Sequence, residues 1–136
     1  MRKPSPALSL LIQHYNAHNR SEGKSPKTVG WYQEVLDLFL RWLIDNGQGT
    51  TLAHMDLQLV RGFVLFLQEG GFVGITPSSS TMNNRVRALR AFFHWIQTEG
   101  YAKTHILQNM RPPKVARHVV EPLTAEYADI DPIGIA

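Results

Sequence analysis

Hydroxyl, amide and guanidinium side chains are concentrated in the stretch SSSTMNNRVR, residues 78–87. Hydroxyl groups and the unpaired backbone N–H groups at a helix start are donors suited to phosphate oxygens. Asn and Arg carry the amide and guanidinium groups that bind adenine and guanine edges in a DNA major groove. The stretch therefore indicates a nucleic-acid contact, in which hydroxyls position the backbone and longer side chains read bases. Its candidate contact residues are Ser79, Ser80, Thr81, Asn84, Arg85 and Arg87.

A second helix start has a similar composition. In SPKTVGWY, Ser25 occupies the expected cap position, and Lys27 and Thr28 follow in the first turn. Serine and threonine before a helix are also the ordinary capping residues, so the cluster carries more weight than any one member. Two such starts predict two helices that enter or straddle one groove.

The charge distribution favours a polyanionic partner. The chain carries a net charge of +3, but four of its 11 acidic residues fall within residues 121–136. Between Thr76 and His118 there are seven basic residues and one acidic residue, Glu99. A basic body of this kind points to nucleic acid before it points to an acidic metabolite.

Several other function classes lack their signatures in this sequence. The chain has no Cys, which excludes disulfides and thiolate metal sites. The serine run forms no nucleophile elbow, and there is no phosphate loop or dinucleotide fingerprint. We therefore expect no catalytic residue, no metal, no cofactor and no small-molecule substrate. The N-terminus is neither a signal peptide nor a membrane span, so we expect no membrane partner and a cytoplasmic protein.

Helical periodicity dominates the chain, and a length of 136 residues suits one core. We predict an all-α, compact bundle of four to five helices. The expected helices span residues 6–18, 26–46, about 57–69, about 79–99 and, as a short fifth helix, 105–109. The fourth is expected to bury Met82, Val86, Leu89, Phe93 and Ile96. Asn83, Arg87 and His94 should lie on its opposite face, and Arg85 and Arg90 on the borders.

The chain resembles the N-terminal core-binding, SAM-like domain of tyrosine recombinases, the phage-type integrases and Xer-type enzymes. The resemblance covers roughly residues 5–124. The second helix matches the pattern S-x-x-T-x-x-x-Y-x-x-x-L-x-x-F-x-x-W-L through Ser25, Thr28, Tyr32, Leu36, Phe39, Trp42 and Leu43. The stretches NRVRALRAFFHWIQTEGY and PPKVARHVVEPLT match the fourth helix and the exit linker.

This resemblance implies one half of a C-shaped clamp on double-stranded DNA, acting in site-specific recombination and integration. Lys27 and Thr28 correspond to groove-facing positions of the second helix, the candidates in residues 79–87 to those of the fourth, and Lys114 and Arg117 to the linker. It also implies other recombinase subunits as partners on DNA. Residues 1–118 are expected to form the DNA-binding domain, and residues 119–136 a linker and the truncated start of a catalytic domain. Without that domain we expect no enzymatic strand cleavage, and Tyr127 is not expected to be a nucleophile.

One alternative from another class stays open. The chain is also compatible with a helical protein–protein interaction module whose basic face is incidental. Exposed apolar groups such as Trp31, Phe72 or Val73 would then pack against another subunit. The salt dependence of binding separates the two, because DNA binding weakens steeply with salt and an apolar contact does not.

Overall fold

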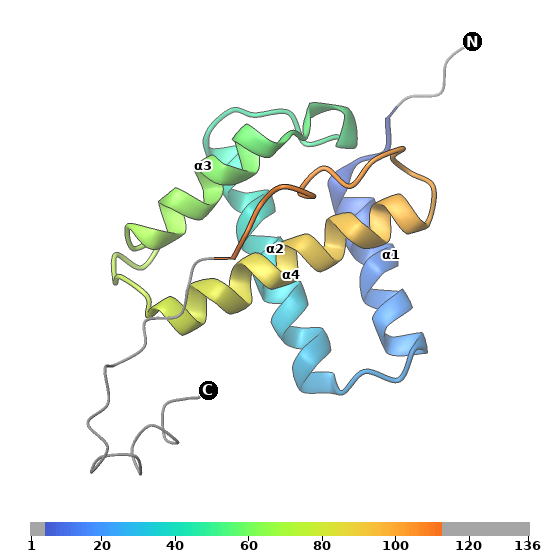
Figure 1. Ribbon diagram of the computed structural model, residues 1–136, viewed down its shortest axis with the longest axis horizontal. Coiled ribbons are helices and arrows are strands. Elements are labelled where there is room, and N and C mark those ends of the chain that lie inside the picture. The colour runs from blue at the N-terminus through green and yellow to red at the C-terminus, as the bar shows by residue number, and fades with distance from the viewer. Residues whose placement is uncertain (1–4, 113–136) are drawn as a thin grey trace.

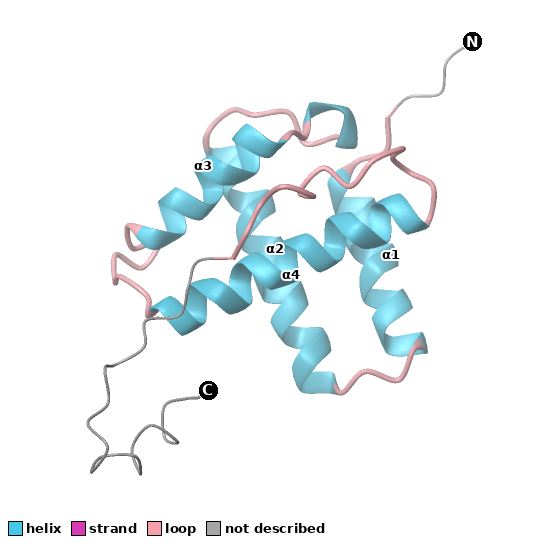
Figure 2. Cartoon of the chain, in the orientation of Figure 1, coloured by secondary structure: helices cyan, strands magenta, loops and turns pink. Residues whose placement is uncertain are grey.

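Four α-helices and one 3-10 turn make up the part of the chain that the structure describes. The computed structural model describes residues 5–112 (Figure 1). Within this range Figure 2 shows helices and loops and no strand, so the predicted all-α class is confirmed. The elements in chain order are α1 (Leu8–Ser21), α2 (Pro26–Asp45), the 3-10 turn η1 (Leu52–His54), α3 (Leu57–Gln68) and α4 (Ser79–Thr98).

Side-chain caps fix the starts of three helices. Ser25, Asp56 and Ser78 accept hydrogen bonds from the backbone N–H three residues later, at the starts of α2, α3 and α4 respectively. Pro26 occupies the first turn of α2, where a missing N–H removes no intrahelical bond. These bonds satisfy donors that a helix start otherwise leaves unpaired, so local sequence alone determines where the three helices begin.

The start of α1 is instead set by a contact distant in sequence. The Leu8 N–H donates to the Thr50 carbonyl at 2.8 Å, and the Leu52 N–H donates to the Pro6 carbonyl at 2.9 Å. These bonds hold the chain extended up to residue 7, so α1 begins two residues later than the predicted residue 6. The helix then continues to Ser21, three residues past the expected end.

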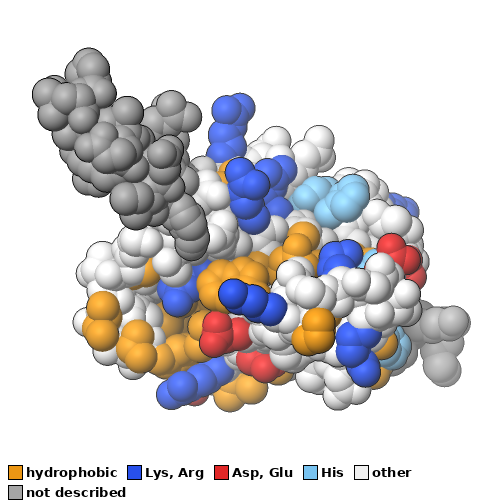
Figure 3. All heavy atoms as spheres, turned by 90° about the horizontal axis from the view of Figure 1, so that it is seen from below, with side chains coloured by type: hydrophobic (Ala, Val, Ile, Leu, Met, Phe, Trp, Pro, Cys, Tyr) orange, Lys and Arg blue, Asp and Glu red, His pale blue; other side chains and the backbone are white. Residues whose placement is uncertain are grey.

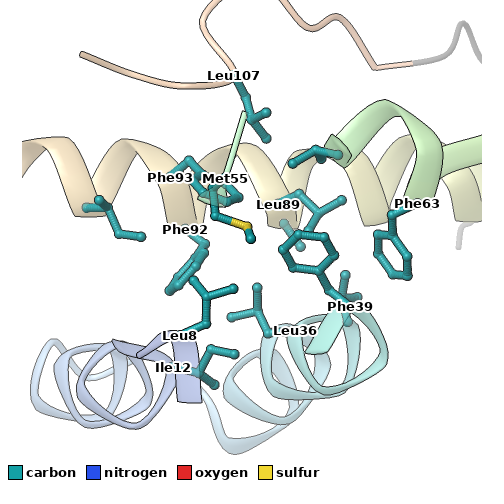
Figure 4. Packing of buried hydrophobic residues seen from close by; sticks show 14 of the residues in the cluster. Leu8, Ile12, Leu36, Phe39, Met55, Phe63, Leu89, Phe92, Phe93 and Leu107 are labelled. Atoms are coloured by element: carbon teal, nitrogen blue, oxygen red, sulfur yellow. The ribbon is translucent and has the colours of Figure 1, made fainter. Parts of the chain in front are cut away.

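Helix α4 is buried from two sides. It packs against α2 and α3, and α1 packs against α2. Figure 4 shows Leu8, Ile12 and Leu36 below α4, and Leu107 above it from the segment that follows α4. The five residues predicted to form the buried stripe of α4 are buried, and three further residues join them: Ala88, Phe92 and Trp95.

The predicted fifth helix at residues 105–109 is wrong. Residues 106–109 form turns, with bonds from the Gln108 N–H to the His105 carbonyl and from the Met110 N–H to the Leu107 carbonyl, both 3.0 Å. The Leu107 N–H donates instead to His105 Nδ1 at 3.1 Å, so a side chain takes a backbone donor. The turns bring Leu107 and Met110 into the core, where they cover α4.

Candidate nucleic-acid interface

A groove with a volume of about 760 Å³ lies between α2 and α4. Both helices contribute residues from their first turns, and α4 crosses α2 in Figure 1. Five of the predicted contact residues line this groove: Lys27, Thr28, Thr81, Asn84 and Arg87. The structure thus brings together side chains that are more than fifty residues apart in sequence, as expected for two helices that face one ligand.

The starts of α2 and α4 are built in the same way. Ser25 Oγ accepts from the Thr28 N–H at 3.2 Å and donates to Thr28 Oγ1 at 3.0 Å. Ser78 and Thr81 make the same pair of bonds, at 3.1 Å and 3.0 Å. Because each threonine hydroxyl accepts from its serine, its own proton is left to donate to a ligand in the groove. Each serine is therefore the cap, and each threonine presents a donor beside a positive helix end.

The longer groove residues add charge and an amide. Lys27, Asn84 and Arg87 are exposed at the surface, and none of them forms an ion pair within the described residues. Figure 3 shows the molecule from below the view of Figure 1, which is the side where α2 begins. Lys and Arg side chains are spread over this face. An ammonium group, a guanidinium group and two hydroxyl donors suit phosphate oxygens, and an exposed amide suits a base edge.

Arg85 lies elsewhere on α4. It does not line the groove, its side chain is half-buried, and its Nε is buried without a hydrogen-bond partner. Burial lowers the pKa of Arg85, and the charge of Glu34 partly opposes this shift. Arg85 is two residues from Arg87, about 200° around the helix, so the two side chains leave α4 in nearly opposite directions.

The remaining predicted residues are not brought into the groove. Ser79 and Ser80, in the first turn of α4, are partly exposed but do not line it. Lys114 and Arg117 lie outside the described residues, as does the expected boundary at residue 118.

The sequence predictions missed five groove residues: Gly30, Trp31, Tyr32, Glu34 and Ala88. Lys27, Trp31 and Glu34 follow one another at four- and three-residue spacing, so they share one face of α2. That spacing was a signal available in the sequence. The Glu34 carboxylate would repel phosphate but can accept a hydrogen bond from cytosine N4 in a major groove.

Within the described part of the chain we find neither a group of side chains suited to a metal ion nor a helix suited to span a membrane. His14 and His18 lie four residues apart on α1, but within residues 5–112 no group of three His, Cys, Asp or Glu side chains could hold a metal ion. None of the helices in this range is both long and apolar enough to cross a lipid bilayer.

Comparison with known proteins identifies a family. A profile of the family described as "Phage integrase, N-terminal SAM-like domain" matches residues 12–100, which include the whole groove. Tyrosine recombinase XerA of Thermococcus onnurineus is 30% identical over 120 residues, or 88% of this chain. Tyrosine recombinase XerC of Pseudomonas fluorescens is 28% identical over 122 residues, or 89% of this chain.

The match covers only part of these relatives. It corresponds to 36% of the length of the XerA relative and 39% of the XerC relative, so the chain spans little more than a third of either. No solved structure gives a significant match.

Proposed function

This chain belongs to the family of phage integrase N-terminal SAM-like domains, and from that premise we propose that it binds duplex DNA through the groove between α2 and α4. The binding serves site-specific recombination and integration, and the domain forms one half of a clamp around the double helix. The relatives whose names describe them as tyrosine recombinases support this proposal. Strand cleavage is not assigned to this chain alone.

The groove is the observation that carries the proposal. It combines two positive helix ends, the hydroxyls of Thr28 and Thr81, and the cations Lys27 and Arg87. Because hydroxyl donors lie at both helix starts, a phosphate can be held on either side of the groove. Asn84 also lines the groove, and its amide is proposed to contact base edges.

Residues beyond the described range complete the proposal. Lys114 and Arg117 are proposed to contact phosphates from the linker, and residues 119–136 to lead toward a catalytic domain. Other recombinase subunits are proposed partners on the same DNA. Each of these statements follows from the family resemblance and from the basic character of residues 111–117.

A salt titration tests the proposal. The purified chain is titrated into a fluorescent duplex of about 30 base pairs at several salt concentrations, and the slope of log affinity against log salt is fitted. Each phosphate that the protein neutralises contributes about −0.9 to this slope. A groove variant, Lys27→Ala with Arg87→Ala, should make the slope less negative by about 1.8. The absence of binding to duplex at low salt would overturn the proposal.

A protein–protein contact is the second candidate, and exposed apolar residues between α3 and α4 favour it. Val73 is 77% exposed and Ile75 is 71% exposed. Phe72 is less available, because its ring packs on Phe66 and lies under the Arg41 guanidinium, 3.9 Å from the ring centre. Association that persists at high salt and is lost in Val73→Ser would favour this function over DNA binding.

A further inference from the structure

Three nitrogen-bearing side chains lie near one another at the C-terminal half of α4, away from the groove at its start. Arg90 and His94 come from α4, and His105 comes from the segment after it. The His94 and His105 ring centres lie 5.7 Å apart. No acidic side chain within the described residues forms an ion pair with any of the three. Figure 3 shows His side chains gathered beside Lys and Arg side chains on the face seen there.

His105 has one ring nitrogen assigned by a hydrogen bond. Its Nδ1 accepts from the Leu107 N–H at 3.1 Å, so the proton of the neutral ring is on Nε2. No described residue accepts a hydrogen bond from that Nε2–H. His105 therefore holds an Nε2–H donor whose position is fixed by the turn and that can donate to a ligand.

The surroundings of the cluster disfavour extra positive charge unless an anion is present. Burial lowers the pKa of His105, and the nearby charges of Arg90 and His94 lower it further. Arg90 Nε is buried without a partner. Two other charged residues are near the cluster in sequence: Glu99 at the end of α4, and Lys103 in the same segment as His105. The Gln97 side-chain amide donates a hydrogen bond to the Lys103 carbonyl at 3.4 Å. An anion bound here would attract each of these groups and so offset both their mutual repulsion and the cost of burying their charged forms.

The cluster continues the exposed face that carries Arg87. His94 follows Arg87 by seven residues, close to two helical turns, so the two side chains leave α4 in nearly the same direction, about 10 Å apart along the axis. Arg87 and His94 are both exposed. A polyanion that contacts Arg87 at the groove can therefore extend along α4 to His94.

We propose that Arg90, His94 and His105 form a phosphodiester-binding site that extends the DNA contact along α4 beyond the groove. This inference rests on the proposed function, because its ligand is the backbone of the same duplex. At neutral pH the His105 Nε2–H and the Arg90 guanidinium are the donors to the phosphate. At lower pH the bound phosphate stabilises the imidazolium form of His105, so DNA binding takes up a proton and strengthens as pH falls.

Two substitutions remove the histidine donors while keeping the local structure. In His105→Asn, the amide oxygen replaces Nδ1 as acceptor for the Leu107 N–H, and the Nε2–H is lost. In His94→Gln, the exposed position keeps a polar side chain of similar reach that carries no charge. His14→Gln, at an exposed position on α1, is the matched control. The thermal unfolding midpoint of each variant shows whether the fold is intact.

The experiment measures duplex binding at about pH 8 and about pH 5.5, across a salt series. For the wild type and His14→Gln, the salt slope should become more negative at the lower pH by about 0.9, the contribution of one imidazolium, that of His105, in contact with a phosphate. The double variant should lose this change with pH, and because it also lacks the His105 Nε2–H donor it should bind more weakly than the wild type at pH 8 as well. A third variant, Arg90→Gln, should make the slope less negative by about 0.9 at both pH values.

Two results separate the failure of this site from the failure of the proposed function. If the wild type binds DNA and the double variant keeps the full pH dependence, the second site is overturned and the groove proposal stands. If the wild type does not bind duplex at either pH, the proposed function fails, and this inference fails with it.

Discussion

The two sides of α4 differ in what they do for the protein. The core side buries aromatic rings between α1, α2 and the segment after α4, as Figure 4 shows for Phe92 and Phe93. The exposed side carries Asn84, Arg87 and His94. Because the two sets occupy opposite arcs of one helix, stability and binding can be changed separately.

The core side and the exposed side of α4 also differ in the titratable group that packs on each. On the core side, Tyr15 packs on Phe92 and Trp95, with ring centres 5.3 Å and 5.2 Å away. On the exposed side, His105 packs on His94. Burial favours the neutral form in both cases, raising the pKa of Tyr15 and lowering that of His105. The core group should therefore affect folding at alkaline pH, and the surface group should affect binding at acidic pH.

The largest expected effect is a loss of stability from the core side. Phe93 is 1% exposed, and its ring packs against Phe39 and Phe92. Phe93→Ala should lower the free energy of unfolding by about 3–5 kcal/mol, because it removes buried surface and leaves a cavity. Urea unfolding measures the change. Thr98→Ala, at an exposed position of the same helix, is the control and should change stability by less than about 0.5 kcal/mol. Equal losses in the two variants would contradict the division of α4 into two sides.

A smaller loss of stability is expected from pH. Burial raises the pKa of Tyr15 to about 12, an effect that the nearby Asn19 side chain opposes and Tyr32 reinforces. Because the folded pKa lies above the unfolded value of about 10, this contribution is fully present below pH 10 and is lost as pH rises toward 12. The maximum loss is about 2–3 kcal/mol.

Urea unfolding at a series of alkaline pH values measures this loss. In Tyr15→Phe the stability should fall less steeply with pH than in the wild type. Tyr101→Phe, at an exposed position, should keep the wild-type steepness. If Tyr15→Phe also keeps it, ionisation of Tyr15 does not destabilise the fold.

Local signals predicted the parts of this fold that depend on neighbouring residues. The caps Ser25 and Asp56 and the inward stripe of α4 follow from short-range bonding and from helical period. Phe92 and Trp95 were not predicted to be buried, because their burial depends on chain segments that cover a second side of α4. The fifth helix was predicted wrongly for a related reason, since the His105 side chain competes for a backbone donor.

The candidate interface was predictable to a similar extent. Lys27, Thr28, Thr81, Asn84 and Arg87 could be identified from residue type and helix position, and the structure places all five in one groove. Whether Arg85 joins them depends on how α4 is rotated against α2. A helical wheel centred on Met82 put Arg85 at a border, and its half-buried side chain confirms that position. The wheel does not show where α2 lies, so it could not show that Arg85 is outside the groove.

Arg87 and Arg85 provide a comparison between a residue that lines the groove and one that does not. Arg87 lines the groove, so Arg87→Ala should weaken binding to all sequences and make the salt slope less negative by about 0.9. Arg85 does not line the groove, so Arg85→Ala should leave discrimination between sequences unchanged. If Arg85 reads a base, as the sequence predicts, the variant would instead lose about 1–3 kcal/mol of discrimination at one position. Site selection from a randomised duplex library measures both effects. An equal loss on all sequences in Arg85→Ala would assign this residue to phosphate or to a structural role.

The smallest expected effect comes from one residue that serves both sides. Ser78 caps α4, accepting from the Thr81 N–H at 3.1 Å, and lies next to the groove through its bond to the Thr81 hydroxyl. Ser78→Ala should lower stability by about 1 kcal/mol, because one helix donor loses its partner. Ser78→Asp should keep the cap and most of the stability, since aspartate caps a helix about as well as serine. Its carboxylate, however, places a negative charge beside a proposed phosphate contact, so DNA binding should weaken in Ser78→Asp while the unfolding midpoint stays close to that of the wild type. A variant that keeps both stability and affinity would show that DNA does not approach this end of α4.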